Sequence, residues 1–176
     1  MTDLKLPPVL LAKRAIREAL ASTATIGAVA ILLANNVTWV GHGPVPVSQP
    51  LSLTDPIESD QLTLIGEVLA DSASPDSQPH MFTQEPVTFA VVVNATVADN
   101  ATMTADDYLD MLAAEIQAIV MADRTLAGTS RNVTYSGWEK RDVGMSTAIR
   151  TLIVNFEVLI RYTADNPLAD SVLTTV

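Results

Sequence analysis

The stretch PVTFAVVVNATV, at residues 86–97, decides the fold class of this chain. Its side chains alternate with a period of two, and most of them are apolar or β-branched. The residues that share one face are Val87, Phe89, Val91, Val93, Ala95 and Val97. Because alternate side chains of a strand point to opposite faces of a sheet, this pattern predicts a strand with one buried face.

The C-terminal third of the chain has the pattern of an antiparallel hairpin. Residues 132–139 (NVTYSGWE) and 148–163 (AIRTLIVNFEVLIRYT) suit its two strands, and the charged, glycine-containing residues 140–144 suit the turn. The expected core face of the return strand consists of Leu152, Val154, Phe156, Val158, Ile160 and Tyr162. We expect this face to pack under a helix.

That helix is predicted over residues 104–123. Thr104 is a candidate N-cap, and Asp106 and Asp107 follow in the first turn, where carboxylates oppose the positive end of a helix. Its apolar stripe recurs at helical spacing and comprises Leu109, Leu112, Ala113, Ile116, Ile119 and Val120. Gly128 is expected to close the turn that follows.

A second amphipathic helix is predicted over residues 9–21. It follows Pro7 and Pro8, and proline is tolerated in the first turn of a helix. The residues at helical spacing are Leu10, Ala12 or Lys13, Ile16 and Leu20, with charged residues on the other side.

The middle of the chain is less regular. Residues 26–40 are apolar and ambiguous, and a short helix as far as Ala34 followed by a strand through Val37, Trp39 and Val40 is one arrangement that fits them. Prolines interrupt residues 41–85 at a density that disfavours long helices and central strands. Within them only residues 61–70 (QLTLIGEVLA) are expected to form an element, and residues 71–85 are expected to be loop.

The order of these elements predicts a single α+β domain over residues 1–176. Its antiparallel β-sheet carries helices packed on one face. Residues 41–85 form an irregular proline-rich insertion with long loops, and residues 167–176 form a loose tail.

Composition argues against several classes of function. The net charge is -10 with ten basic residues, whereas affinity for nucleic acid comes largely from neutralising phosphates with Lys and Arg. There is no cysteine, which removes disulfides, thiolate metal sites and cysteine nucleophiles. His42 and His80 lie in proline-rich segments without metal-ligand spacing. We therefore predict a protein that is not an enzyme and has no cofactor or metal.

Two further features have a functional and a structural interpretation. Asp106, Asp107 and Asp110 suit a divalent-cation site, but we favour a helix cap with a solvated face. Residues 24–34 (ATIGAVAILLA) resemble a signal peptide or membrane anchor, but the run is about half the ~20 residues that a spanning helix needs. A buried helix or strand is the favoured interpretation.

The outward face of the last strand is the clearest sign of an interface. It reads Ile153, Asn155, Glu157, Leu159 and Arg161, which is mixed rather than polar. A sheet face that meets only water is usually polar, so a neighbouring subunit is expected to cover it. The candidate interface residues are Ile153, Leu159, Arg161, Val92 and Trp138. Trp39 and Trp138 are read as core or interface anchors rather than as ligand-stacking groups.

The run from Tyr108 to Pro167 resembles the tail terminator proteins of long-tailed bacteriophages. The resemblance rests on LAAEIxAxxxxDRTLAG at residues 112–128, a strand ending in SGWE at 136–139, and a return strand closing on RYT with a proline after it. The early RAIREAL, at residues 14–20, is compatible with it.

This resemblance implies a homohexameric ring on the end of the finished tail tube. Such a ring stops tube polymerisation and joins the tail to the head connector, so the implied partners are other copies of the chain, the tail tube protein and the head–tail connector protein. DNA would pass through without specific binding, and no membrane is involved. The implied location is the tail or neck of the virion, after assembly in the host cytoplasm.

The acidity of the chain has a physical use in such a ring, because a negative lumen repels DNA phosphates. The lumen candidates are Asp71, Asp76, Glu85, Asp106 and Asp107. Three alternatives remain open: another neck or head-completion connector subunit, an exported or membrane-anchored bacterial domain, and a hydrolase with a nonstandard Ser/His site.

Overall fold

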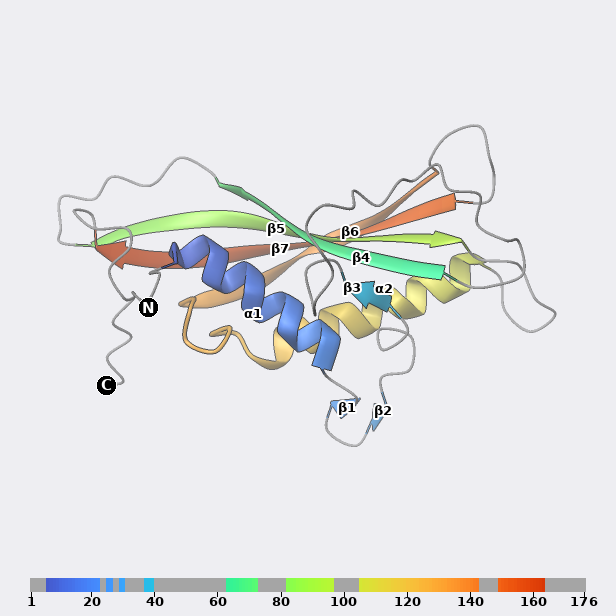
Figure 1. The fold of residues 1–176 in the computed structure, drawn as a ribbon, viewed down its shortest axis with the longest axis horizontal. Coiled ribbons are helices and arrows are strands. Elements are labelled where there is room, and N and C mark those ends of the chain that lie inside the picture. The colour runs from blue at the N-terminus through green and yellow to red at the C-terminus, as the bar shows by residue number, and fades with distance from the viewer. Residues whose placement is uncertain are drawn as a thin grey trace, which may run out of the picture.

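The computed structural model describes residues 6–22, 25–26, 29–30, 37–39, 63–72, 82–96, 105–142 and 149–163. They form two layers, a β-sheet and two helices that lie on one of its faces (Figure 1). The helices are α1 (Pro8–Ser22) and α2 (Ala105–Ala122). The sheet strands are β3 (Val37–Trp39), β4 (Thr63–Ser72), β5 (Phe82–Thr96), β6 (Asn132–Asp142) and β7 (Ile149–Thr163). The predicted α+β fold with helices on one face of the sheet is confirmed.

The sheet has the strand order β3-β4-β5-β7-β6. The four longer strands are antiparallel neighbours, and β5 and β7 pair from Phe82↔Thr163 to Thr96↔Ile149. The short β3 runs parallel to β4 at one edge, which the sequence did not predict. The element expected at residues 61–70 is therefore a full member of the sheet. The proline-rich residues 41–62 and the tail 167–176 lie outside the described residues.

β5 begins at Phe82, so the expected loop over residues 71–85 is wrong where β4 ends and β5 starts. Pro86 lies within β5 opposite Leu159, whose carbonyl accepts a hydrogen bond from the Arg131 N–H at 2.9 Å. Because the N–H and C=O of a strand residue point to the same side, Leu159 directs both toward β6. The missing N–H of Pro86 therefore removes no hydrogen bond to β7. It removes none to β4 either, because the pairing of β4 with β5 ends at Ser72↔Val87.

The core lies between the sheet and the two helices. The predicted faces of β5 and β7 are buried from Val87 to Ala95 and from Leu152 to Ile160, as are the α2 stripe and one side of α1. Tyr162 is half-buried, and Val97 lies outside the described residues. The α1 side consists of Pro8, Ala12, Ile16 and Leu20. Tyr135 of β6 adds an aromatic contact to Phe156, with ring centroids 5.9 Å apart. Each large buried side chain contributes about 1.5–3 kcal/mol, so this face holds the layers together.

The start of α1 follows from its prolines. The N–H groups of Leu10 and Leu11 donate to the carbonyl of Pro7 at 2.9 and 3.1 Å, so Pro7 occupies the capping position and Pro8 the first turn. At the other end, the Ser22 hydroxyl donates to the Glu18 carbonyl at 2.5 Å. The predicted first helix is confirmed.

Of the arrangement considered for residues 26–40, the strand is present as β3, but the residues described before Ala34 do not form a helix. Thr25–Ile26 and Val29–Ala30 form two short antiparallel strands, β1 and β2. Thr, Ile and Val are β-branched and Gly27 disfavours a helix, so the local sequence supports the extended form. Among the helices described, none is long and apolar enough to cross a membrane.

Trp39 packs inside the molecule rather than at its surface. Its side chain is 5% exposed, and its ring lies against Gly66 of β4, where no side chain intervenes. The indole Nε1 has no hydrogen-bond partner among the described residues. Trp39 is therefore a core anchor, which agrees with the favoured interpretation.

The turn after α2 is held by the carboxylate of Asp123. It accepts hydrogen bonds from the Thr125 N–H at 2.9 Å, the Thr125 hydroxyl at 2.6 Å and the Ala127 N–H at 2.7 Å. These bonds support positive φ angles at Leu126 (47°), Ala127 (56°) and Gly128 (84°). The turn predicted at Gly128 is confirmed, and Leu126 is buried beneath it.

Candidate interaction site

The outer face of the sheet, turned away from α1 and α2, carries a contiguous apolar patch. Val92 of β5 lies opposite Ile153 of β7, and Leu69 of β4 lies opposite Ala90 of β5. We call these residues the apolar patch. Leu69 is 43% exposed, and the other members are half-buried. The two predicted interface residues Val92 and Ile153 therefore lie side by side.

Carboxylates flank this patch on both sides. In the register of the sheet, Glu67 lies beside Val92 and Glu139 lies beside Ile153. One position beyond Leu69 and Ala90 on the same face, Asp71 of β4 and Glu157 of β7 lie on either side of Thr88. We call these residues, Glu67, Asp71, Glu139 and Glu157, the acidic rim. All of them are exposed.

Among the described side chains of the outer face, the basic residue is Arg141, which lies opposite Thr151. Its guanidinium contacts the Glu139 carboxylate at 2.5 Å, so these two charges compensate each other. The described side chains of the outer face therefore carry excess negative charge around an apolar centre. Nearby, Thr151 donates a hydrogen bond to the Asn94 side-chain oxygen at 2.7 Å, which joins β7 to β5.

Leu159 and Arg161 are less closely tied to the patch. Leu159 is half-buried and lies between Pro86 and Asn132, beyond Glu157 along β7. Arg161 is paired with Gln84 in the backbone register, and its side chain is outside the described set. Of the predicted interface residues, the apolar patch thus contains Val92 and Ile153.

An irregularity in β6 places Trp138 on the helix side of the sheet. The register shifts between Tyr135 and Gly137, and Gly137 has a φ of 116°. This bulge moves every later side chain to the opposite face, so Trp138 lies opposite the core residue Val154. Trp138 remains 42% exposed, but the structure does not bring it together with Val92 and Ile153.

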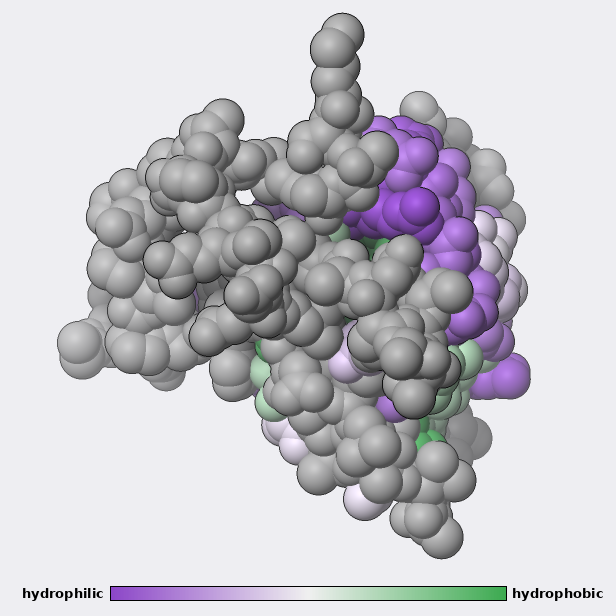
Figure 2. Space-filling view, turned by 90° about the vertical axis from the view of Figure 1, so that its right-hand side faces the viewer, coloured by the Kyte–Doolittle hydropathy of each residue, from purple (hydrophilic) through white to green (hydrophobic). Residues whose placement is uncertain are grey.

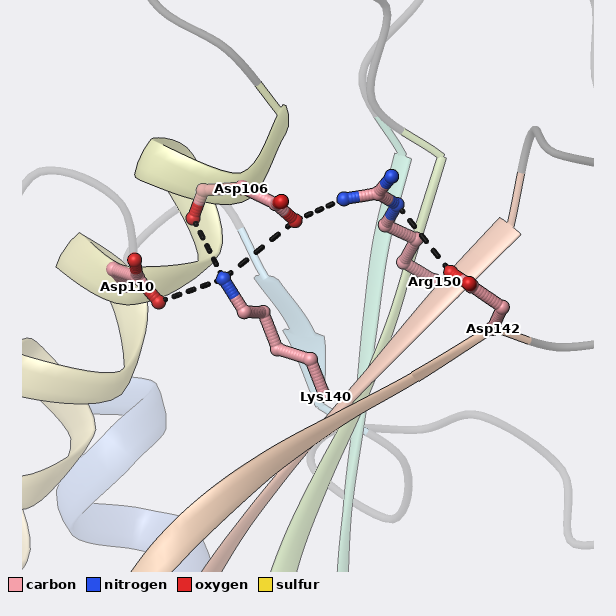
Figure 3. Close-up of polar contacts among 5 residues, drawn as sticks. All are labelled: Asp106, Asp110, Lys140, Asp142 and Arg150. Carbon is pink, nitrogen blue, oxygen red and sulfur yellow. Dashed lines mark hydrogen bonds and ion pairs between the residues drawn. The ribbon is translucent and has the colours of Figure 1, made fainter.

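The same bulge brings Lys140 to α2 and corrects the predicted turn. Residues 140–142 belong to β6 rather than to a turn, and the residues between Asp142 and Ile149 lie outside the described set. Lys140 Nζ contacts Asp110 at 2.9 Å and Asp106 at 3.5 Å (Figure 3). It also lies 5.4 Å from the ring centroid of Trp138. Lys140, which the sequence predicts in a turn, is therefore a strand residue whose ammonium group forms ion pairs with the first turns of α2.

Arg150 of β7 completes this charged junction between the hairpin and α2. Its guanidinium hydrogen-bonds to Asp106, and its Nε lies 3.5 Å from Asp142 (Figure 3). The hydrogen bond from Arg150, with help from Lys140, lowers the pKa of Asp106. Figure 2 views the molecule from this end and shows hydrophilic surface gathered on one side of it.

Lys140 itself is stabilised as a cation. Partial burial acts to lower its pKa, but the hydrogen bond to Asp110 and the charges of Asp106 and Asp110 outweigh it, and the pKa is raised. Asp106 and Asp110 thus hold a protein ammonium group. This arrangement supports the interpretation of the aspartates as helix-start residues rather than as a divalent-cation site.

The lumen candidates lie at two ends of the sheet. Asp71 and Glu85 are near the start of β5, where Asp71 is exposed and Glu85 contacts Tyr162. Burial and this contact raise the pKa of Tyr162. Asp106 and Asp107 lie at the opposite end, at the start of α2 (Figure 1). Asp76, like His42, His80 and Thr104, lies outside the described residues.

The sequence reasoning missed the contribution of β4 to the interaction site. Leu69 and Glu67 were not among the candidates, because residues 61–70 were recognised only as an element. The signal was present: in EVLAD, at residues 67–71, Glu67, Leu69 and Asp71 share one strand face.

No protein-family model matches the chain, and no curated protein is significantly similar to it.

Proposed function

We propose that this chain is a structural protein that assembles into a ring, caps the tail tube of a long-tailed bacteriophage and joins it to the head connector. The supporting observation is the outer face, where Leu69 and the Val92–Ile153 pair form an apolar patch inside an acidic rim. Apolar patches bordered by polar residues are characteristic of protein-contact surfaces. A ring of identical subunits would bury this patch through a repeated contact that closes on itself.

The turn after α2 is a second support. The segment DRTLAG, at residues 123–128, carries much of the resemblance to tail terminators. Here its aspartate accepts three hydrogen bonds and its leucine is buried, so the segment is bound to the rest of the fold at both residues. The residues of DRTLAG thus occur together because they form one hydrogen-bonded turn over a buried leucine.

Under this proposal, the acidic residues keep DNA from adhering inside the ring. Asp106 is already compensated by Arg150 and Lys140, so it would contribute little to a repelling field. Asp71 is exposed on the acidic rim, so it belongs to the subunit contact argued below rather than to the lumen. This leaves Glu85 at one end of the sheet and Asp107 at the other as the lumen candidates among the residues described.

Immunogold electron microscopy of virions that contain this protein tests the proposal. An antibody against the chain should label the head-proximal end of the tail, both in whole virions and in free tails that have never joined a head. Labelling of heads but not of free tails would instead identify a head-completion subunit. Labelling along the tube, or at neither structure, would contradict the proposal.

A further inference from the structure

Helix α1 is basic in a chain that is strongly acidic overall. The net charge of the chain is -10, yet α1 carries Lys13, Arg14 and Arg17 against a single acidic residue, Glu18. Arg14 and Glu18 are exposed, while Lys13 and Arg17 are half-buried. This helix is therefore the densest basic surface among the described elements.

The same helix presents apolar side chains beside its charges. Leu10 and Leu11, in the first turns of α1, keep part of their surface accessible, whereas Ile16 and Leu20 are fully buried in the core. The exposed side of α1 thus combines leucines with basic groups. The outer face of the sheet has the opposite character, an apolar patch inside an acidic rim.

These two surfaces lie on opposite sides of the molecule. α1 covers the core face of the sheet (Figure 1). The strand register places the apolar patch on the other face. One subunit cannot bring them into contact with each other. A second copy of the chain can, and each subunit would then use one surface on each side.

We propose that copies of this chain associate head-to-tail, with α1 of one copy seated on the outer face of the next. The inference rests on the self-association in the proposed function and specifies its contact. Arg14 and Lys13 would face Glu67 and Asp71 of the neighbour, and the leucines of α1 would cover the apolar patch. Such a heterologous contact uses different surfaces on the two partners, as ring formation requires.

Charge complementarity gives this contact a measurable signature. Reversing charges on one partner replaces attraction with repulsion, which should weaken association by about tenfold or more at low salt. Raising the salt should also weaken the wild-type association, because the Debye length falls from about 10 Å at 0.1 M to about 3 Å at 1 M.

A pair of charge-reversed full-length variants tests the contact. The helix variant carries Lys13→Glu and Arg14→Glu, and the face variant carries Glu67→Lys and Asp71→Lys. Arg124→Glu is the matched control, because Arg124 is exposed in the turn after α2 and lies outside both surfaces. Circular dichroism establishes that each variant folds, and the single changes Arg14→Glu and Glu67→Lys replace any double variant that does not.

Native mass spectrometry at low salt measures the outcome. Each variant alone should be mainly dissociated, because its helix and its outer face have the same sign. An equimolar mixture should reassemble, since the acidic helix fits the basic face and the basic helix fits the acidic face. The Arg124→Glu control should assemble as the wild type does.

Two results would overturn the proposed contact while leaving self-association intact. One is assembly of both charge-reversed variants at wild-type strength, and the other is their dissociation without recovery on mixing. A wild-type chain that stays monomeric at every concentration would overturn the proposed ring itself and the contact with it.

Discussion

Replacing Gly66 with alanine tests the packing that joins β3 to the sheet. A Cβ at this position would lie 2.4 Å from Cε3 and Cζ3 of Trp39 and 2.8 Å from Cγ1 of Val37. Favourable carbon–carbon contacts are about 3.5–4.0 Å, so the added methyl group overlaps the indole by more than about 1 Å. Because Trp39 is 5% exposed, its ring cannot move aside without displacing β3.

Overpacking of this kind is expected to reduce the free energy of unfolding by about 2–3 kcal/mol. For a chain of this size, 1 kcal/mol corresponds to roughly 2–4 °C in Tm, so Tm should fall by about 4–12 °C. Urea unfolding followed by circular dichroism measures the first quantity, and calorimetry measures the second.

A double-mutant cycle with Trp39→Leu separates overlap from other causes. In the Trp39→Leu background, Gly66→Ala should cost clearly less than in the wild type, because the overlap with the ring is gone and the smaller overlap with Cγ1 of Val37 remains. Gly137→Ala is the matched control: a Cβ there meets no atom within 4 Å, but the φ of 116° imposes backbone strain. Its cost should be the same in both backgrounds. Equal costs of Gly66→Ala with and without Trp39 would refute the packing argument.

Three further substitutions test other parts of the fold. Asp123→Ala should lower stability by about 1–2 kcal/mol near neutral pH, because it removes three hydrogen-bond acceptor contacts. The hydrogen bond from the Thr125 hydroxyl is the main cause that lowers the pKa of Asp123 from its ordinary value of 3.8. Urea unfolding should therefore show the full stability difference between wild type and Asp123→Ala above pH 3.8. The difference should disappear as the pH falls through the lowered pKa of the folded state. Lys140→Gln should slightly lower Tm at low salt, with the difference vanishing near 1 M salt, where exposed ion pairs are screened. Phe156→Ala should cost about 3–5 kcal/mol in urea unfolding, since this ring is fully buried, and a loss below about 1 kcal/mol would contradict its place in the core.

The elements with strong periodicity were predictable from the sequence. In β5 and β7 the period of two identified the buried faces, including Phe89 and Phe156, because burial requires apolar side chains at alternate positions. In α2 the apolar stripe and the acidic first turn identified both the buried side and the start of the helix. These signals are local, so they can be read without knowing which strand pairs with which.

Features that depend on pairing were not predictable in the same way. The β6 bulge at Gly137 inserts one residue, which moves Trp138 to the helix side and brings Lys140 to Asp106 and Asp110. A list of alternating residues does not reveal such a shift. Leu69 was overlooked for a related reason, because its place in the apolar patch depends on its register with Ala90.

Proline and charge were also misleading as signals. The sequence predicts a strand that begins at Pro86, but Pro86 lies inside β5, at a position where its missing N–H removes no hydrogen bond to β7. The charges of Lys140 and Arg141 predict a turn, yet both residues belong to β6. Among the strands described, β6 is at an edge of the sheet, where charged side chains are common.

The mass of the native particle in dilute, low-salt solution tests the central claim most directly, since that claim is that this chain works by contact between its own surfaces. Native mass spectrometry should find a single assembly whose mass is a whole multiple, greater than one, of the 18.7 kDa subunit. A particle of 18.7 kDa at every concentration, with or without isolated tails, would contradict it.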